Sequence, residues 1–241
     1  MLQRCLISVL LVLSALFAQA QKRVSVDAEI KSLADGKVTT VTRRIHCQRD
    51  GRLVTVTFTP VKSYLVQNLK GEARFYAPSS NEVYSVMDSK LSSQNNLLYI
   101  FLSGHTDDLG LIALGYNLKT SQIDNEGYLK RTYISAREDL YPSVELVLKN
   151  YLPIYVEYKD TAGNPLGKTY LSDYDTNSSF VFPKRVTEIS YIREKHDSTI
   201  TRTIYSVPDL SGKDKDFDFQ IPQGAKPVAS PLAKFKEAIG K

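Results

Sequence analysis

Apolar and polar residues alternate along most of the chain. The alternation is clear over 24–30 and recurs over 38–47 and 53–58. A two-residue period places the apolar side chains of a strand on one face of a sheet and the polar ones on the other. Asp-Gly pairs at 35–36 and 50–51 separate these segments and favour tight hairpin turns. The pattern therefore predicts consecutive antiparallel strands.

The same period continues towards the C-terminus. It predicts further strands over 63–68, 72–77, 82–87, 128–136, 143–149, 152–158, 168–172, 186–192, 200–207 and 217–222. About a dozen strands in sequence, with helices in only one insertion, favour a mainly β fold built on one large antiparallel sheet that curls. The absence of a Pro/Ser/Gly linker in the middle favours a single domain over 21–228.

The alternation breaks in an insertion over 91–118. Residues 94–102 follow serines that can cap a helix and end before Gly104, which is typical of a short helix with a glycine stop. Asp107 and Asp108 can cap a second short helix over 109–114. Both segments are apolar nearly all round, so each must be covered on several sides or must itself cover an apolar surface. The sequence leaves open whether they close a cavity or complete an ordinary core.

The two ends of the chain carry their own patterns. Residues 1–20 combine Arg4, an apolar run over 6–17 and a small-x-small ending, which is typical of a cleaved secretory signal peptide. Cys5 precedes that run, whereas a lipidated cysteine follows it, so we expect an exported, soluble protein without a lipid anchor. Ser230 and Pro231 predict a short helix within the 229–241 tail.

Composition and spacing give little sign of catalysis or metal binding. The net charge of +5 is spread along the chain, so no nucleic-acid footprint is present. His46 and Cys47 are adjacent on a predicted strand and therefore point to opposite faces. None of the three histidines has a partner at metal-binding spacing, and no Gly-x-Ser-x-Gly motif occurs. We expect no enzyme activity, no metal and no cofactor; a hydrolase is the least favoured class.

Three segments resemble the periplasmic lipoprotein carriers of the LolA type and their LolB-like relatives. They are residues 49–60, which end in Thr59-Pro60; residues 71–78 with Glu82-Val83-Tyr84; and residues 217–228, with the pattern Phe-x-Phe-x-x-Pro-x-Gly-x-x-Val. The chain departs from the family in lacking a long helix before the first strand and in adding the 186–207 hairpin. Asp50 and Thr55 also replace an expected proline and tryptophan.

The resemblance implies an unclosed β-barrel with a helical lid over a hydrophobic cavity that accepts acyl chains. It implies a soluble periplasmic carrier of acyl chains with two protein partners. An inner-membrane complex would load the carrier, and an outer-membrane receptor would unload it. Arg49 stands where the family has an arginine that holds the lid. We expect a monomer, and the alternative function is a sensing or protein-interaction module without a transport role.

A cavity of this kind requires inward apolar residues from the sheet and the insertion. The candidates for contact with acyl chains are Val54, Val56, Phe58, Phe75, Leu97, Ile100, Phe101, Ile112, Val144, Leu146 and Ile154.

Overall fold

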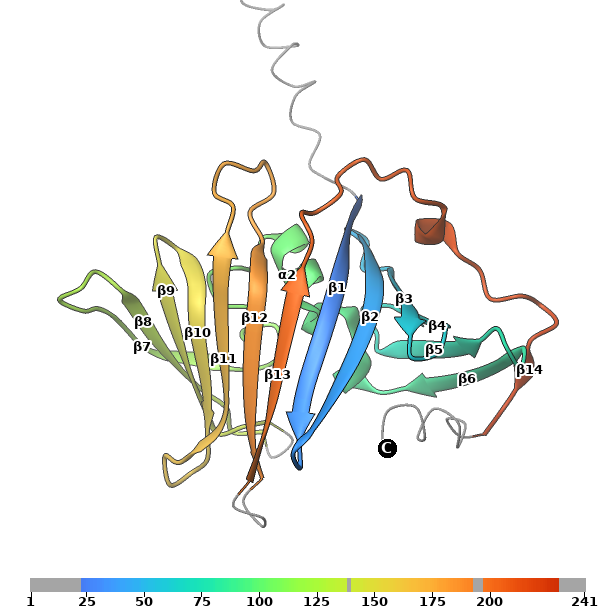
Figure 1. Ribbon diagram of the computed structural model, residues 1–241. Coiled ribbons are helices and arrows are strands. Elements are labelled where there is room, and N and C mark those ends of the chain that lie inside the picture. Colours follow the sequence, from blue (N-terminus) through green and yellow to red (C-terminus); the bar gives the residue numbers. More distant parts are fainter. Residues whose placement is uncertain (1–22, 138–139, 193–196, 230–241) are drawn as a thin grey trace, which may run out of the picture.

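One curled sheet forms the body of the molecule. The computed structural model describes residues 23–137, 140–192 and 197–229. Within them, strands form a 14-stranded sheet in the order β14-β6-β5-β4-β3-β2-β1-β13-β12-β11-β10-β9-β8-β7 (Figure 1). The predicted signal peptide and the predicted C-terminal helix from Ser230 lie outside the described residues. No helix in the described part of the chain is long and apolar enough to cross a membrane.

Apart from β7 and β14, the strands lie where the alternation predicts them. The strands are β1 (Arg23–Ala34), β2 (Lys37–Gln48), β3 (Leu53–Thr59), β4 (Ser63–Gln67), β5 (Glu72–Ala77), β6 (Glu82–Met87), β7 (Asn117–Ile123), β8 (Leu129–Ile134), β9 (Ser143–Lys149), β10 (Leu152–Lys159), β11 (Pro165–Tyr174), β12 (Pro183–Ile192), β13 (Asp197–Tyr205) and β14 (Lys226–Pro227). Neighbouring strands pair antiparallel, except that β14 runs parallel to β6.

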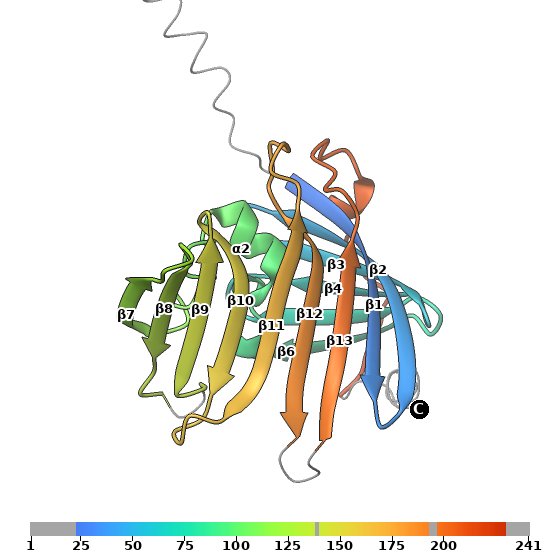
Figure 2. The same ribbon diagram turned by 60° about the vertical axis from the view of Figure 1, so that its left-hand side comes forward.

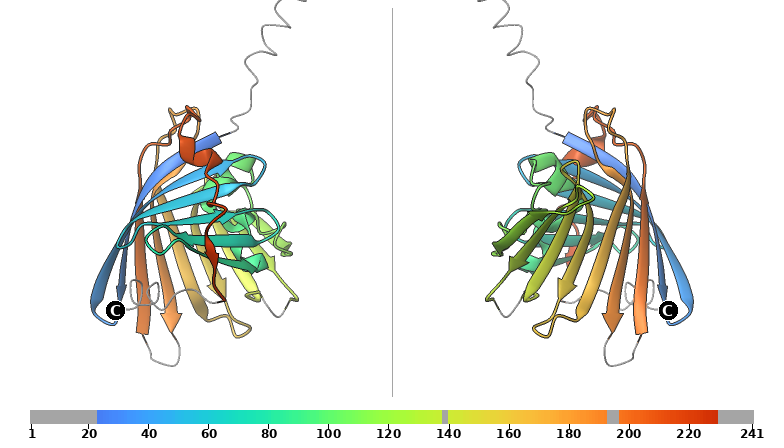
Figure 3. Two further views of the ribbon diagram at one scale, coloured as in Figure 1. Left: turned by 90° about the vertical axis from the view of Figure 1, so that its right-hand side faces the viewer. Right: turned by 90° about the vertical axis from the view of Figure 1, so that its left-hand side faces the viewer.

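The sheet curls but does not close, because β14 and β7 remain as two unpaired edges. Figures 2 and 3 show the two halves of the sheet bending towards each other around a concave side. The helix α2 (Leu97–Ser103) lies on that concave side. The predicted mainly β fold, an incomplete barrel with a short helix over its interior, is confirmed.

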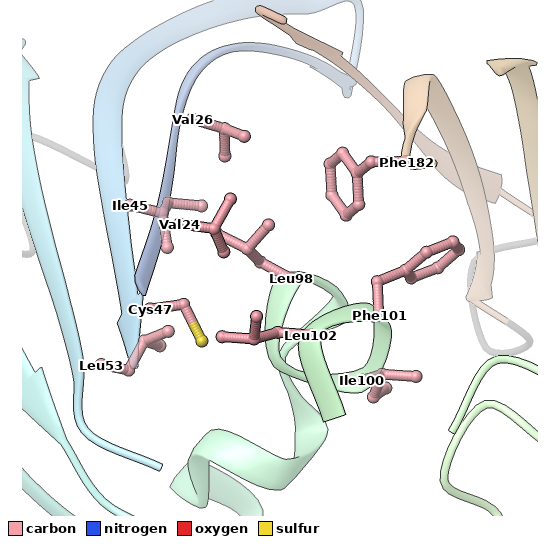
Figure 4. Packing of buried hydrophobic residues seen from close by; sticks show 10 residues of the cluster. All are labelled: Val24, Val26, Ile45, Cys47, Leu53, Leu98, Ile100, Phe101, Leu102 and Phe182. Carbon is pink, nitrogen blue, oxygen red and sulfur yellow. The ribbon is translucent and has the colours of Figure 1, made fainter. Parts of the chain in front are cut away.

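Helix α2 ends at the predicted glycine, but it begins later than predicted, because Ser92 caps the 3-10 turn Ser93–Asn95 and not the helix. The Asn96 side chain accepts a hydrogen bond from the Leu98 backbone N–H at 3.0 Å, which caps the first turn. Gly104 takes a left-handed conformation with φ +84°, which ends the helix without a Cβ penalty. Leu98, Phe101 and Leu102 pack against β1–β3 and the Phe182 ring, as Figure 4 shows. The helix is therefore a packed part of the core.

The predicted second helix over 109–114 is wrong: the segment forms turns. Leu109 and Gly110 have φ values of +51° and +75°, which a right-handed helix does not allow. The Asp108 carboxylate still accepts hydrogen bonds from the backbone N–H groups of Gly110 and Ile112, at 2.9 and 3.1 Å. The acidic cap therefore holds a turn instead of starting a helix.

The predicted last strand over 217–222 is also wrong. The 3-10 helix η4 (Lys215–Asp218) occupies its start, and β14 lies further on. We call residues 206–228 the C-terminal strap. The strap crosses the outer face of the sheet, over the first strands (Figure 3, left). The Phe217 side chain of the strap is fully buried against the sheet, so it anchors the strap there.

Strand β7 was not predicted. Every residue of Asn117–Ile123 is exposed, so the strand has no buried face that would require apolar residues at every second position. It is an edge strand whose backbone pairs with that of β8. Alternation of side chains cannot reveal a strand of this kind.

Candidate functional site

A cavity of about 380 Å³ lies on the concave side of the sheet, between the insertion and strands β10–β13. This volume falls within the range of roughly 300–1,000 Å³ that is common for small-molecule sites. Its lining residues are Arg43, Asn95, Asn96, Leu97, Ile100, Leu109, Leu111, Leu114, Val156, Tyr158, Thr169, Leu171, Val186, Glu188 and Tyr205. The wall combines aliphatic and aromatic side chains with the polar groups of Arg43, Asn95, Asn96, Thr169 and Glu188.

The strand register forms the sheet side of this wall. Val156 lies opposite Thr169, and Leu171 lies opposite Val186, so their side chains share one face of the sheet. The insertion supplies the facing wall through α2 and the turns that follow it. Since side chains on one strand alternate between faces, alternate residues of each strand face the cavity. Val156, Leu171 and Val186 form its apolar part, and Thr169 and Glu188 stand beside them.

Five predicted residues lie at or directly behind this wall. Leu97 and Ile100 line the cavity. Phe101 is buried beside the Phe182 ring, with ring centroids 5.2 Å apart. Val144 and Leu146 are fully buried and share a cluster with lining residues of β10–β12.

The structure does not bring Val54, Val56 and Phe58 to the cavity. Val54 lies opposite His46 in the register of β2 and β3, on the outer face of the sheet. Val54 and Val56 are buried there, and Phe58 is 47% exposed near the end of β3. The concave face of β3 carries Leu53 instead, because a shift of one residue reverses the face.

The other candidates also lie apart from the cavity. Phe75 is half-buried against the Tyr84 ring, with centroids 6.0 Å apart. Ile112 is 60% exposed, and Ile154 is half-buried at a β-bulge in β10. Arg49 is exposed on the β2–β3 turn, where its charge acts on the Tyr99 phenol of α2. Its role as a lid latch stays a prediction.

The sequence reasoning missed the charged pair in the cavity wall. Burial lowers the pKa of Arg43, and no partner for its buried Nε exists within the described residues. Burial raises the pKa of the Glu188 carboxyl, and Arg43 offsets part of that rise. Burial also raises the pKa of Tyr158 to about 12. Arg43 alternates in β2 with Ile45 and Cys47 and so lies on the same face as they do. A charged residue on an otherwise apolar strand face was the available signal.

Replacing Glu188 by glutamine is expected to stabilise the fold at neutral pH. The folded state holds the Glu188 proton more tightly than the unfolded chain does, so stability falls as the pH rises above 4.5, the ordinary value for this carboxyl. Glutamine removes that penalty. Thermal unfolding at neutral pH should show a higher Tm for Glu188→Gln, and the difference should shrink below pH 4.5. The exposed control Glu126→Gln should show no such dependence; an equal shift in both variants contradicts the prediction.

Comparisons with known proteins place the fold. No protein-family model and no curated protein matches the sequence. The LolA superfamily protein NE2245 from Nitrosomonas europaea has a similar structure, with a TM-score of 0.57 at 10% identity; the match covers 83% of this chain and 91% of that one. A DUF1329 family protein from Desulfovibrio piger gives a TM-score of 0.58 at 14% identity, over 87% of this chain and 93% of its own.

A third solved structure, from Vibrio parahaemolyticus, is a domain named for outer membrane lipoprotein sorting. It gives a TM-score of 0.55 at 15% identity and covers 83% of this chain and 91% of its own. At these identities the likeness concerns the fold alone. The chain has the LolA-like fold, an unclosed β-barrel around a helix-bearing insertion.

Proposed function

We propose that this protein is a periplasmic carrier that holds an acyl chain of a lipoprotein, or of a lipid, in the cavity on its concave side. The observation that carries the proposal is the cavity itself, which has the apolar residues Val156, Leu171 and Val186 on its sheet side and leucines of the insertion on the facing side. Burial of each methylene stabilises by about 0.8 kcal/mol. Even partial insertion of one chain therefore offsets part of the cost of association.

The polar groups of the wall fit the polar end of such a cargo. The guanidinium of Arg43 can donate hydrogen bonds to ester or carboxylate oxygens. A second cavity of about 200 Å³ shares Asn95 and Leu114 with the first and is bordered by Lys70 and Lys90. An amphipathic cargo could thus place its chain in the apolar cavity and its head among these donors.

Loading and release require part of the wall to move. Helix α2 is tied into the core by Leu98 and Leu102, which are buried. The turns around Leu109 and Leu111 also line the cavity, and they form no regular helix. We propose that these turns are the moving part of the lid. A membrane loading complex and an outer-membrane receptor are the partners proposed for the two steps, acting on a monomeric carrier.

Replacing Leu97 by glutamate is expected to weaken uptake of a fluorescent fatty acid at least tenfold. Leu97 lines the cavity, so the change places a carboxylate against the acyl chain. It also lies in the first turn of α2, where an acidic side chain favours the helix, so the fold should survive. Fluorescence titration of the delipidated protein gives the affinity, and circular dichroism checks the fold.

The matched control is Ile112→Glu, in the same insertion but on an exposed side chain. It should bind the probe as the wild type does. The proposal fails if the wild type takes up no probe at saturating concentration. It fails equally if both variants lose binding to the same extent.

A further inference from the structure

Three potential metal ligands meet on the outer face of the sheet, away from the cavity. His46 comes from β2, and Asp214 and Asp216 come from the C-terminal strap. One ring nitrogen and one oxygen from each carboxylate all lie within 4.8 Å of one another. The strap thus brings together residues from opposite ends of the described chain.

The His46 ring points to a missing ligand. Its side chain is 0% exposed, and neither Nδ1 nor Nε2 has a hydrogen-bond partner in the part of the chain that the structure describes. Leaving a buried polar group unsatisfied is costly, and native structures rarely do so.

The two carboxylates differ in how far they are already engaged. Asp214 accepts the Asp216 backbone N–H at 3.0 Å and an Arg44 N–H at 3.2 Å. Arg44 also forms a two-bonded pair with Asp27, at 2.7 Å for each bond, so Asp27 balances much of its charge. The Asp216 carboxylate makes no hydrogen bond or ion pair with any described residue, and it is only half-buried. Asp216 is therefore free to coordinate.

We propose that His46, Asp214 and Asp216 form a binding site for a divalent transition-metal ion of the Zn²⁺ class. Imidazole nitrogen and carboxylate oxygen are both Zn²⁺ ligands, and three protein ligands leave the fourth position for water. Ca²⁺ and Mg²⁺ prefer oxygen ligands, so an imidazole ligand makes the site less suitable for these two ions. Ligands of a tetrahedral Zn²⁺ lie about 3.3 Å apart, so small rotations of the aspartate side chains close the site.

The ion would fasten the strap to the sheet. The strap is already held nearby by the Arg23–Asp218 ion pair at 2.6 Å and by the Phe217 carbonyl, which accepts from Gln48 at 2.8 Å. The Phe217 ring also meets the His46 ring edge-on, with centroids 5.0 Å apart. These contacts position the ligands before the ion binds, which lowers the cost of closing the site.

Titration calorimetry of untagged, chelator-treated protein with Zn²⁺ at neutral pH tests the site. We expect one ion per chain and a Tm that rises with Zn²⁺ concentration, while Mg²⁺ and Ca²⁺ leave Tm unchanged. Asp216→Asn should fold normally and weaken Zn²⁺ binding at least tenfold. Co²⁺ in place of Zn²⁺ should give the visible absorption of a tetrahedral site.

The matched control is Asp218→Asn, an acid of the same strap that pairs with Arg23 instead of facing His46. Its Zn²⁺ affinity should equal that of the wild type. The proposal is overturned if the wild type shows no binding heat and no Tm shift. Equal weakening by Asp216→Asn and Asp218→Asn also overturns it, because that result indicates diffuse attraction by the acidic strap.

Discussion

Replacing Leu98 by alanine is expected to lower the free energy of unfolding by about 2–5 kcal/mol. Leu98 is 1% exposed and packs against Val24, Val26 and Ile45 on the concave face. Deleting its side chain removes buried methyl groups and leaves a cavity between α2 and the sheet. Since domains are stable by only about 5–15 kcal/mol, this single change takes a large share of the total.

Urea denaturation followed by circular dichroism measures this loss. Ile112→Ala serves as the control, because Ile112 is in the same insertion but exposed to solvent. We expect the control to change stability by less than about 0.5 kcal/mol. A similar small effect for Leu98→Ala would mean that α2 is a loosely held lid and not part of the core.

Replacing Phe217 by alanine is expected to cost about 3–5 kcal/mol. The Phe217 ring is fully buried between the strap backbone and the sheet and meets the His46 ring edge-on. The Arg23 Cζ atom lies over this ring, 5.3 Å from its centroid. Loss of the ring removes the central anchor of η4. The strap should then detach locally, while strands β8–β12 on the other half of the sheet stay folded.

Hydrogen exchange separates local from global loss in this variant. Backbone amides of residues 206–228, and of the β2 and β3 residues beneath them, should exchange faster, and those of β10–β12 should not. Val207→Ala, at an exposed position of the same strap, is the control and should leave exchange unchanged. Unchanged protection in Phe217→Ala contradicts the account of the strap.

The sequence was sufficient for the strands with one buried face. Over β1–β6 and β8–β13 the two-residue period marked the elements because burial imposed it. The two wrong elements involve short apolar segments whose backbone is set by other forces. Positive φ values at Leu109 and Gly110 break the expected helix, and side-chain anchoring of Phe217 replaces the expected strand.

The site was less predictable than the fold, because it depends on which face each residue occupies. Leu97 and Ile100 were found from their apolar helix, whereas Val54 and Val56 were assigned to the cavity although their parity places them with His46 on the outer face. A strand pattern with apolar residues on both faces carries no sign of which is concave. Glu188 was not predicted, because only apolar residues were considered as lining of the cavity.

The proposed metal ligands illustrate a different limit. His46 stands far from Asp214 and Asp216 in sequence, so no local spacing links them. The strap, which the sequence analysis took for an ordinary strand, brings them together. Contacts made by irregular segments depend on the tertiary path of the chain, and no periodicity encodes that path.

The central claim is that the concave cavity holds an acyl chain. Photocrosslinking with a diazirine fatty acid, followed by mass spectrometry of the peptides, tests where such a chain lies. We predict labels on peptides that contain Leu171 and Val186, and on the insertion around Leu109 and Leu111. A label on the Val54 side chain, which lies on the outer face, or labelling spread evenly over the surface, would contradict the account.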